Sequence, residues 1–148
     1  MRLHTLKALL GSAFLAATVT TGFAGTAIAA EPVKVVYHIS DGNEQAQRAL
    51  NNIRNHLAAE PTTKITVVAL GEGIQFMLDG AKDKNGKPFQ AAVDSLVEKG
   101  VEFRVCNNTL NNHNVPTSKV LKEAKIVPAG VAEVARLQAQ EGHVYLRP

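Results

Sequence analysis

The chain has 148 residues, with 16 Lys and Arg against 13 Asp and Glu, a single cysteine and no tryptophan. Without its first 30 residues it keeps 14 basic and 13 acidic residues, which argues against binding nucleic acid or an anionic membrane. The remaining 118 residues are enough for one hydrophobic core and too few for a second domain.

The first 30 residues have the three regions of a secretory signal peptide. Arg2 and Lys7 supply the positive start, a mostly apolar run of small residues follows, and Ala27-Ile28-Ala29-Ala30 matches a small-x-small cleavage site. The glycines and threonines of this run make it a poor membrane anchor. We therefore expect cleavage near residues 29–30, a mature domain of residues 31–148 and, in a bacterium, a periplasmic protein without stable membrane insertion.

Strand-like and helix-like patterns alternate in the first half of the mature domain. The predicted order is strand 33–39, helix 44–60, strand 64–70, a short helix near 74–80 and helix 88–100. A charged loop over 82–87 precedes the last of these helices. Pro88 suits the start of that helix, and Gly100 suits its C-terminal cap.

The alternation continues in the second half. The predicted order is strand 101–105, an asparagine-rich loop over 107–114, short helix 116–122, strand 124–127, helix 130–140 and strand 143–146. In the helix over 130–140 we expect Val131, Val134 and Ala135 to face inward. We expect Gly142 to end that helix.

This alternation predicts a single three-layer α/β domain, with a mainly parallel five-stranded flavodoxin-like sheet and helices on both faces. In such sheets, ligands bind outside the carboxyl ends of the strands. Four segments are expected to meet there: 40–42, 71–73, 106–108 and 128–130.

Cys106 is the only thiol of a chain that begins with an export signal, so it cannot close an internal disulfide. It is therefore buried and inert, paired with another molecule, or free to react. Its position after a predicted strand favours an accessible nucleophile. A small buried hydrophobic side chain is the alternative. Arg104, two residues earlier, is expected on the same side of the strand.

Two histidines also lie near the predicted edge. His38 is close to the carboxyl end of the first strand, where it can orient a ligand, or assist Cys106 if the two strands are neighbours. A structural role is the alternative for His38. Cys106, His38 and His113 together have suitable donors for a metal site. Their spacing matches no compact ligand pattern, however, and we expect no metal.

Asp41 and Glu72 follow the first two strands and are candidates for a general acid–base pair. The context of Asp41 favours another role for it, as the N-cap of the next helix. Asn107 and Asn108 can donate hydrogen bonds to a bound anion, although asparagines are common in turns. The segment 71–73 lacks the third glycine of a dinucleotide site and the lysine of a P-loop, so we expect no nucleotide cofactor.

Three segments together resemble the DsrE/DsrF-like family of small sulfur-handling proteins, in its exported branch. They are Val-Tyr-His-Ile-Ser-Asp-Gly at 36–42, Val-Val-Ala-Leu-Gly-Glu-Gly at 67–73 and Val-Glu-Phe-Arg-Val-Cys-Asn-Asn-Thr-Leu at 101–110. The resemblance implies a five-stranded α/β fold and a trimer or hexamer. It also implies a persulfide-carrying role that maps onto Cys106 alone.

The leading hypothesis is a periplasmic sulfur carrier or relay protein that binds sulfane sulfur as a persulfide on Cys106, with possible transferase-like activity. Its substrate-binding residues would be His38, Asp41, Glu72, Asn107 and Asn108. Its partners would be sulfur donor and acceptor proteins or small sulfur compounds. The alternative is a non-catalytic oligomeric binding or accessory protein in which Cys106 is structural.

Overall fold

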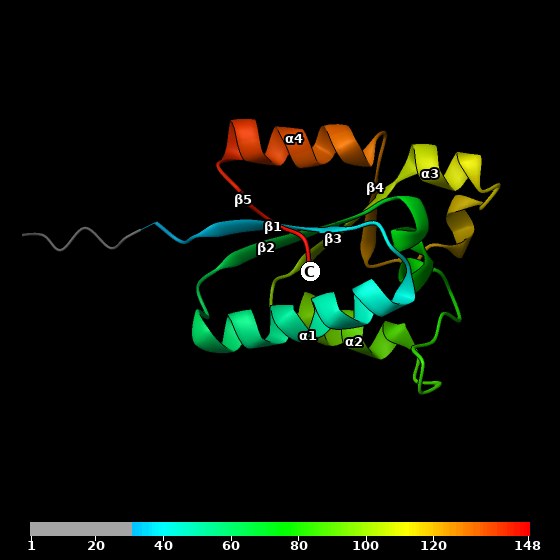
Figure 1. Ribbon diagram of the computed structural model, residues 1–148, viewed down its shortest axis with the longest axis horizontal. Coiled ribbons are helices and arrows are strands. Elements are labelled where there is room, and N and C mark those ends of the chain that lie inside the picture. The colour runs from blue at the N-terminus through cyan, green and yellow to red at the C-terminus, as the bar shows by residue number, and fades with distance from the viewer. Residues whose placement is uncertain (1–30) are drawn as a thin grey trace, which may run out of the picture. The chain divides into compact units, whose positions relative to one another are not determined.

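The computed structural model describes residues 31–148, so the predicted signal peptide lies outside the described residues. A five-stranded, all-parallel sheet forms the centre of the domain (Figure 1). Its strands are β1 (Lys34–Ile39), β2 (Lys64–Ala69), β3 (Glu102–Cys106), β4 (Ala124–Val127) and β5 (Val144–Leu146). The predicted fold class, a single α/β domain with a parallel sheet, is confirmed.

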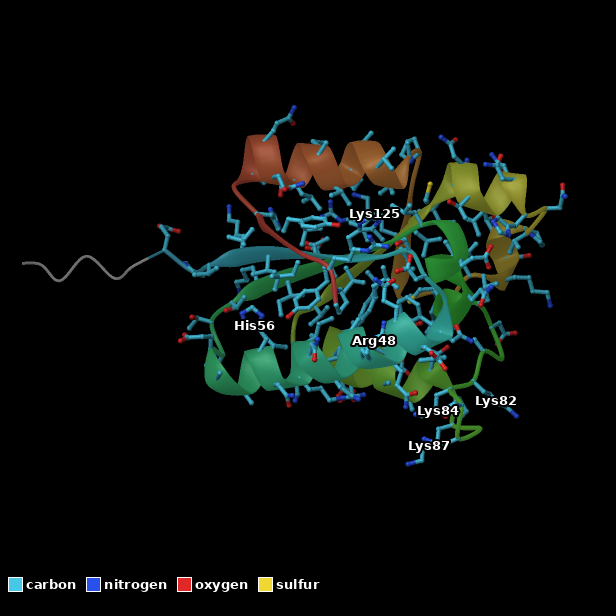
Figure 2. The ribbon with its side chains drawn as sticks, in the orientation of Figure 1. Arg48, His56, Lys82, Lys84, Lys87 and Lys125 are labelled. Carbon is cyan, nitrogen blue, oxygen red and sulfur yellow. The ribbon has the colours of Figure 1, made fainter. Side chains whose placement is uncertain are left out.

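Helices lie on both faces of this sheet. The α-helices are α1 (Asn43–Ala59), α2 (Phe89–Val97), α3 (Asn107–Asn112) and α4 (Gly130–Glu141), and the 3₁₀-helices are η1 (Gly71–Met77) and η2 (Thr117–Lys119). Helices α1 and α2 cover one face, and α4 covers the other (Figure 1). A loop that carries Lys82, Lys84 and Lys87 projects beyond α2 (Figure 2). None of the helices in residues 31–148 has the length and apolar character needed to cross a membrane.

The strand order is β4-β3-β2-β1-β5. It differs from the 2-1-3-4-5 order of flavodoxin, although the layers are those of a flavodoxin-like fold. From β1 to β4 each strand is added on the same side, whereas β5 returns to the other side of β1. Because crossovers are right-handed, the reversal places α4 on the face opposite α1 and α2.

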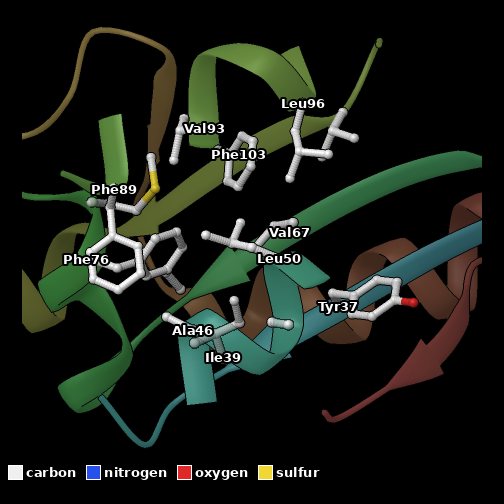
Figure 3. Close-up of a cluster of buried hydrophobic side chains, with 14 of the residues drawn as sticks. Tyr37, Ile39, Ala46, Leu50, Val67, Phe76, Phe89, Val93, Leu96 and Phe103 are labelled. Atoms are coloured by element: carbon white, nitrogen blue, oxygen red, sulfur yellow. The ribbon is translucent and has the colours of Figure 1, made fainter. Parts of the chain in front are cut away.

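The larger core lies between the sheet and the helices α1 and α2 (Figure 3). Alternate residues of the strands, such as Tyr37, Val67 and Phe103, point into this core, because successive side chains of a strand point to opposite faces of the sheet. Phe76 of η1 packs edge-to-face on Phe103, with ring centroids 6.3 Å apart. A smaller core of Val36, Val68, Val134 and Leu137 lies under α4.

The structure corrects two predictions about local elements. The segment after Cys106 is helix α3 instead of a loop, because Thr109 and Leu110 are buried and stabilise a helix that asparagine disfavours. In α4, Val134 faces inward as predicted, but Val131 is 67% exposed and Ala135 is also exposed. Gly142 ends α4 in the left-handed conformation, with φ of 71°, as predicted.

Candidate functional site

Cys106 is the last residue of β3 and immediately precedes α3. The strand begins and ends one residue later than predicted, because Cys106 pairs with Val127 of β4. The thiol forms no disulfide, and the residue is only 4% exposed. The site therefore has a nearly buried sulfur at the carboxyl edge of the sheet.

Several hydrogen-bond donors surround this sulfur. Burial raises the pKa of Cys106, but the Thr109 hydroxyl and the backbone N–H groups of Gly130, Thr109 and Asn108 lower it. The balance leaves the pKa of Cys106 below the ordinary value for a thiol. Because these donors stabilise the anion, the arrangement favours a thiolate, which is the reactive form of cysteine.

Gly130, the first residue of α4, allows the start of that helix to reach the thiol. A Cβ added at Gly130 would lie 2.8 Å from Cδ2 of Leu70 and 3.0 Å from Cβ of Cys106. Real Cβ atoms essentially never approach other atoms more closely than 3.0 Å, so a larger residue would require Leu70 or the start of α4 to shift. The partial positive charge of the helix N-terminus therefore lies directly beside the cysteine.

The four segments predicted at the carboxyl edge do contact one another. Gly71 donates its backbone N–H to Oγ1 of Thr109 at 3.1 Å. A Cβ built on Gly71 would lie 3.3 Å from the carbonyl oxygen of Ser40, so the ends of β1 and β2 are also close. Asn108 donates its N–H to the carbonyl of Pro128 at 3.2 Å. The loops after β1, β2, β3 and β4 thus form one continuous edge.

His38 does not lie on a strand next to that of Cys106. It pairs with Val68 of β2, and β2 separates β1 from β3. Instead, Nδ1 of His38 is 2.8 Å from the hydroxyl of Tyr145 in β5. Burial and then the charge of Arg147 lower the pKa of His38, against the opposing effect of Asp41. The condition for direct assistance to Cys106 is therefore not met.

Asp41 binds Arg147, a residue that the sequence patterns did not indicate. Nη2 of Arg147 lies 2.9 Å from Oδ1 and 2.8 Å from Oδ2 of Asp41. The Ser40 hydroxyl, and then Arg147, hold the pKa of Asp41 below its ordinary value. Asp41 is not the N-cap of α1, because Gly42 occupies that position without a side-chain hydrogen bond.

Glu72 lies in η1 and has partners of its own. Its carboxylate accepts a hydrogen bond from Gln75, and its Oε1 lies 3.8 Å from Nε2 of His113. The structure thus gives Asp41 and Glu72 separate partners, Arg147 for one and Gln75 for the other.

Asn107 and Asn108 are the first two residues of α3. Asn107 is half-buried and Asn108 is exposed. The backbone N–H of Asn108, which the prediction did not consider, is one of the groups that lower the pKa of Cys106. The sequence also did not indicate Thr109 as a site residue. Its only signal was its position three residues after Cys106, in a segment that was predicted as a loop and is the first turn of α3.

Arg104 and Cys106 point to the same face of the sheet, as predicted, since Arg104 donates to Glu133 of α4. Nη2 of Arg104 lies 2.7 Å from Oε2 of Glu102, so two carboxylates neutralise its charge.

A metal site is not assembled from the candidate ligands. His38 contacts Tyr145, and His113 lies near Glu72. Across residues 31–148, no group of three or more His, Cys, Asp or Glu side chains is placed to hold a metal ion.

Comparison with known proteins identifies the fold and the family. MTH1491, a protein of unknown function from Methanobacterium thermoautotrophicum, is 29% identical with a TM-score of 0.69, and the match covers 78% of this chain and 99% of that chain. The ychN protein from E. coli is 14% identical with a TM-score of 0.57, and the match covers 78% of this chain and 99% of that chain. At this identity the similarity shows the fold alone. None of the curated proteins matches. The model of the DsrE/DsrF-like family matches residues 33–148, and the chain belongs to this family.

Proposed function

We propose that this protein carries or relays sulfane sulfur as a persulfide on Cys106. Family membership supports a sulfur-relay-like role. The observation that carries the proposal is the position of the thiol, directly before α3 and against the first residue of α4, where the Thr109 hydroxyl and nearby backbone N–H donors lower its pKa. A purely structural cysteine would need none of them, because a neutral thiol is a weak hydrogen-bond acceptor.

The proposed chemistry is two thiol-exchange steps without net oxidation. In the first step, the Cys106 thiolate attacks the outer sulfur of a donor persulfide, the S–S bond of the donor breaks, and the donor leaves as a thiolate. In the second step, an acceptor thiolate attacks the outer sulfur of the Cys106 persulfide, which regenerates the Cys106 thiolate. The same N–H groups would stabilise the Cys106 thiolate before the first step and again after the second.

Burial of Cys106 constrains the substrate. Because Cys106 is only 4% exposed, the site would admit small or slender reagents and exclude bulky ones. Polysulfide ions and the extended cysteine of a partner protein fit this constraint. We propose that Asn107, Asn108 and Glu72 contact such a substrate near the sulfur, and that His38 and Asp41 contact it from the end of β1.

Sulfur uptake tests the proposal. After exposure to polysulfide, the wild-type protein is expected to gain the mass of one sulfur atom and to lose it under a reductant. The Cys106→Ser variant is expected to fold normally and to gain nothing. Intact-mass spectrometry checks both results. A reduced wild type that stays unmodified, or a Cys106→Ser variant that takes up sulfur equally, would contradict the proposal.

The alternative function is a binding or accessory protein with a structural cysteine, and the 4% exposure of Cys106 is the observation in its favour. Reaction rates in the native state separate the two functions. A relay cysteine reacts with small alkylating agents without denaturant, whereas a structural cysteine reacts only after unfolding.

We propose in addition that the protein is exported to the periplasm and forms a homo-oligomer. The signal-like sequence of residues 1–30 supports export. The edge strand β5 supports association, because Val144, Tyr145 and Leu146 are 54%, 39% and 37% exposed. Such an edge offers unpaired backbone groups and apolar surface to another copy. Retention of residues 1–29 in the exported protein, or a monomeric mass by light scattering at micromolar concentration, would contradict these proposals.

A further inference from the structure

A groove of about 640 Å³ lies between α1, α2 and the loop of residues 82–88. Its inner lining includes Leu50 of α1 and Phe89 of α2, which are almost fully buried. Polar side chains surround this apolar base: Gln47, Asn51, Arg54, Asn85, Lys87 and Ser95. A second hollow continues along α1 past Arg48 and Lys84 and shares Gln47 and Asn51 with the first.

The loop at one end of this groove has a fixed shape. Oδ1 of Asp83 accepts hydrogen bonds from the backbone N–H groups of Asn85 at 2.8 Å and Lys87 at 2.9 Å. Oδ2 of Asp83 accepts a third from Gln47 of α1 at 3.2 Å. The backbones of Asp83 and Lys87 also pair, at 2.8 Å. The Asp83 carboxylate therefore holds the loop against α1, and binding would not have to order it first.

Cations surround the groove without anionic partners. Arg48 on α1 and the three loop lysines lie on the same side of the molecule in Figure 2. Within residues 31–148, no carboxylate forms an ion pair with any of the five cations of this face, which are Arg48, Arg54, Lys82, Lys84 and Lys87.

Positive charge is concentrated on this face. The groove and its adjoining hollows include five cationic side chains and two carboxylates, Glu44 and Asp83. That is an excess of three, whereas the whole of residues 31–148 has 14 basic and 13 acidic residues, an excess of one. Because the rest of the domain is net acidic, this face would orient an anionic partner.

We propose that this groove docks an extended acidic segment of a partner protein. Its apolar base would take small side chains, and Gln47, Asn51 and Ser95 would bond to the backbone of the segment. The cations would pair with Asp or Glu of the segment. The groove and its hollows line α1 from Glu44 to Arg54, roughly 16 Å, which matches an extended segment of about five residues, so a peptide of about eight residues covers it.

The observations favour a protein segment over nucleic acid or a membrane. Phe89 is the aromatic residue of the groove, and at 3% exposure it offers no ring for a base to stack on. No large hydrophobic side chain that lines the groove is exposed, so nothing there would insert into a bilayer. The proposal is also independent of the chemistry at Cys106.

A fluorescent peptide of about eight alternating Glu and Ala residues tests this docking site by anisotropy at low salt. We expect saturable binding that weakens as salt increases, with little binding of the matched Gln–Ala and Lys–Ala peptides. Arg54→Glu combined with Lys87→Glu should lower the affinity for the Glu–Ala peptide about tenfold. Lys84→Glu with Lys87→Glu, which changes only the exposed loop, is a second variant if the first is unstable. Cys106→Ser should bind like the wild type.

Lys34→Glu combined with Lys125→Glu is the control, because it makes the same change in net charge away from the groove. Equal loss in this control would show a general charge effect and overturn the proposal. Tighter binding of single-stranded DNA or anionic vesicles at this groove would also overturn it. A groove variant that changes the oligomeric mass would show that a second copy of the chain fills the groove, which would also overturn the proposal.

Discussion

Gly130 and Cys106 lie so close together that a side chain on Gly130 would press against the cysteine. A Cβ at Gly130 would stand 3.0 Å from Cβ of Cys106. The two residues come from α4 and from the end of β3, which are separate elements of the chain. Their contact brings the Gly130 N–H to the thiol, where it lowers the pKa of Cys106.

The first prediction concerns Gly130→Ala. The added methyl group should push the start of α4 away and remove one N–H donor from the thiol, so the pKa of Cys106 should rise. Overpacking should also lower the free energy of unfolding by about 1–3 kcal/mol. Rates of alkylation against pH, together with urea unfolding, measure both effects. Ala132→Ser, on the exposed side of α4, should change neither, and an unchanged alkylation profile for Gly130→Ala would contradict the prediction.

The second prediction concerns the Thr109 hydroxyl. Thr109→Val keeps the shape of the side chain but removes its donor to Cys106, so the pKa of the thiol should rise. The variant also leaves the Gly71 N–H without its acceptor, at a cost of about 1–3 kcal/mol. Thr109→Ser keeps the hydroxyl and is expected to alkylate with the pH profile of the wild type. Identical alkylation profiles for Thr109→Val and Thr109→Ser would show that the hydroxyl has no effect on the thiolate.

The third prediction concerns Glu133, whose side chain is 12% exposed. Hydrogen bonds from Arg136, and then from Arg104, lower the pKa of Glu133 from 4.5 to about 2. Its contribution to stability is therefore complete above pH 4.5 and is lost as the pH falls through 2. The full shift corresponds to about 3 kcal/mol, and solvent screening reduces our expectation to about 1 kcal/mol.

Glu133→Gln should therefore destabilise the protein at pH 7 and flatten the loss of stability in acid. Urea unfolding at a series of pH values measures the difference between the variant and the wild type. If both lose stability in parallel between pH 4.5 and 2, Glu133 does not contribute in this way.

The fourth prediction concerns Gln45, which is 1% exposed. Its Oε1 accepts hydrogen bonds from the N–H groups of Ser40 at 2.7 Å and Asp41 at 2.8 Å. Gln45→Leu leaves both groups unsatisfied and should cost about 2–4 kcal/mol. Gln140→Leu, on the surface of α4, should change the free energy of unfolding by less than about 0.5 kcal/mol. A thermal midpoint for Gln45→Leu equal to that of the wild type would contradict the prediction.

The fold was predictable because its signals are local. Strand β4 was predicted over 124–127 and observed over Ala124–Val127, since a short β-branched segment stands between helical patterns. Helix α1 was predicted over 44–60 and observed over Asn43–Ala59. The prediction of α3 failed, because asparagine favours turns and only the burial of Thr109 and Leu110 makes that segment helical.

The candidate site was predictable only in part. Position after a strand placed Cys106 at the carboxyl edge, because parallel strands end together. The strand order was not predictable, so the distance between the strands of His38 and Cys106 was unknown. Arg147 could not be connected with Asp41, because their pairing depends on the return of β5 to the side of β1.

The sequence by itself determined the succession of elements, the class of the fold and the place of its one cysteine at the end of a strand, since periodicity and turn residues are properties of neighbouring positions. The tertiary structure decided which groups surround that cysteine. Thr109 and Gly130 act on the thiol because packing brings α3 and α4 to the end of β3. That contact joins residues 24 positions apart, from Cys106 to Gly130, and no local pattern encodes such a distance.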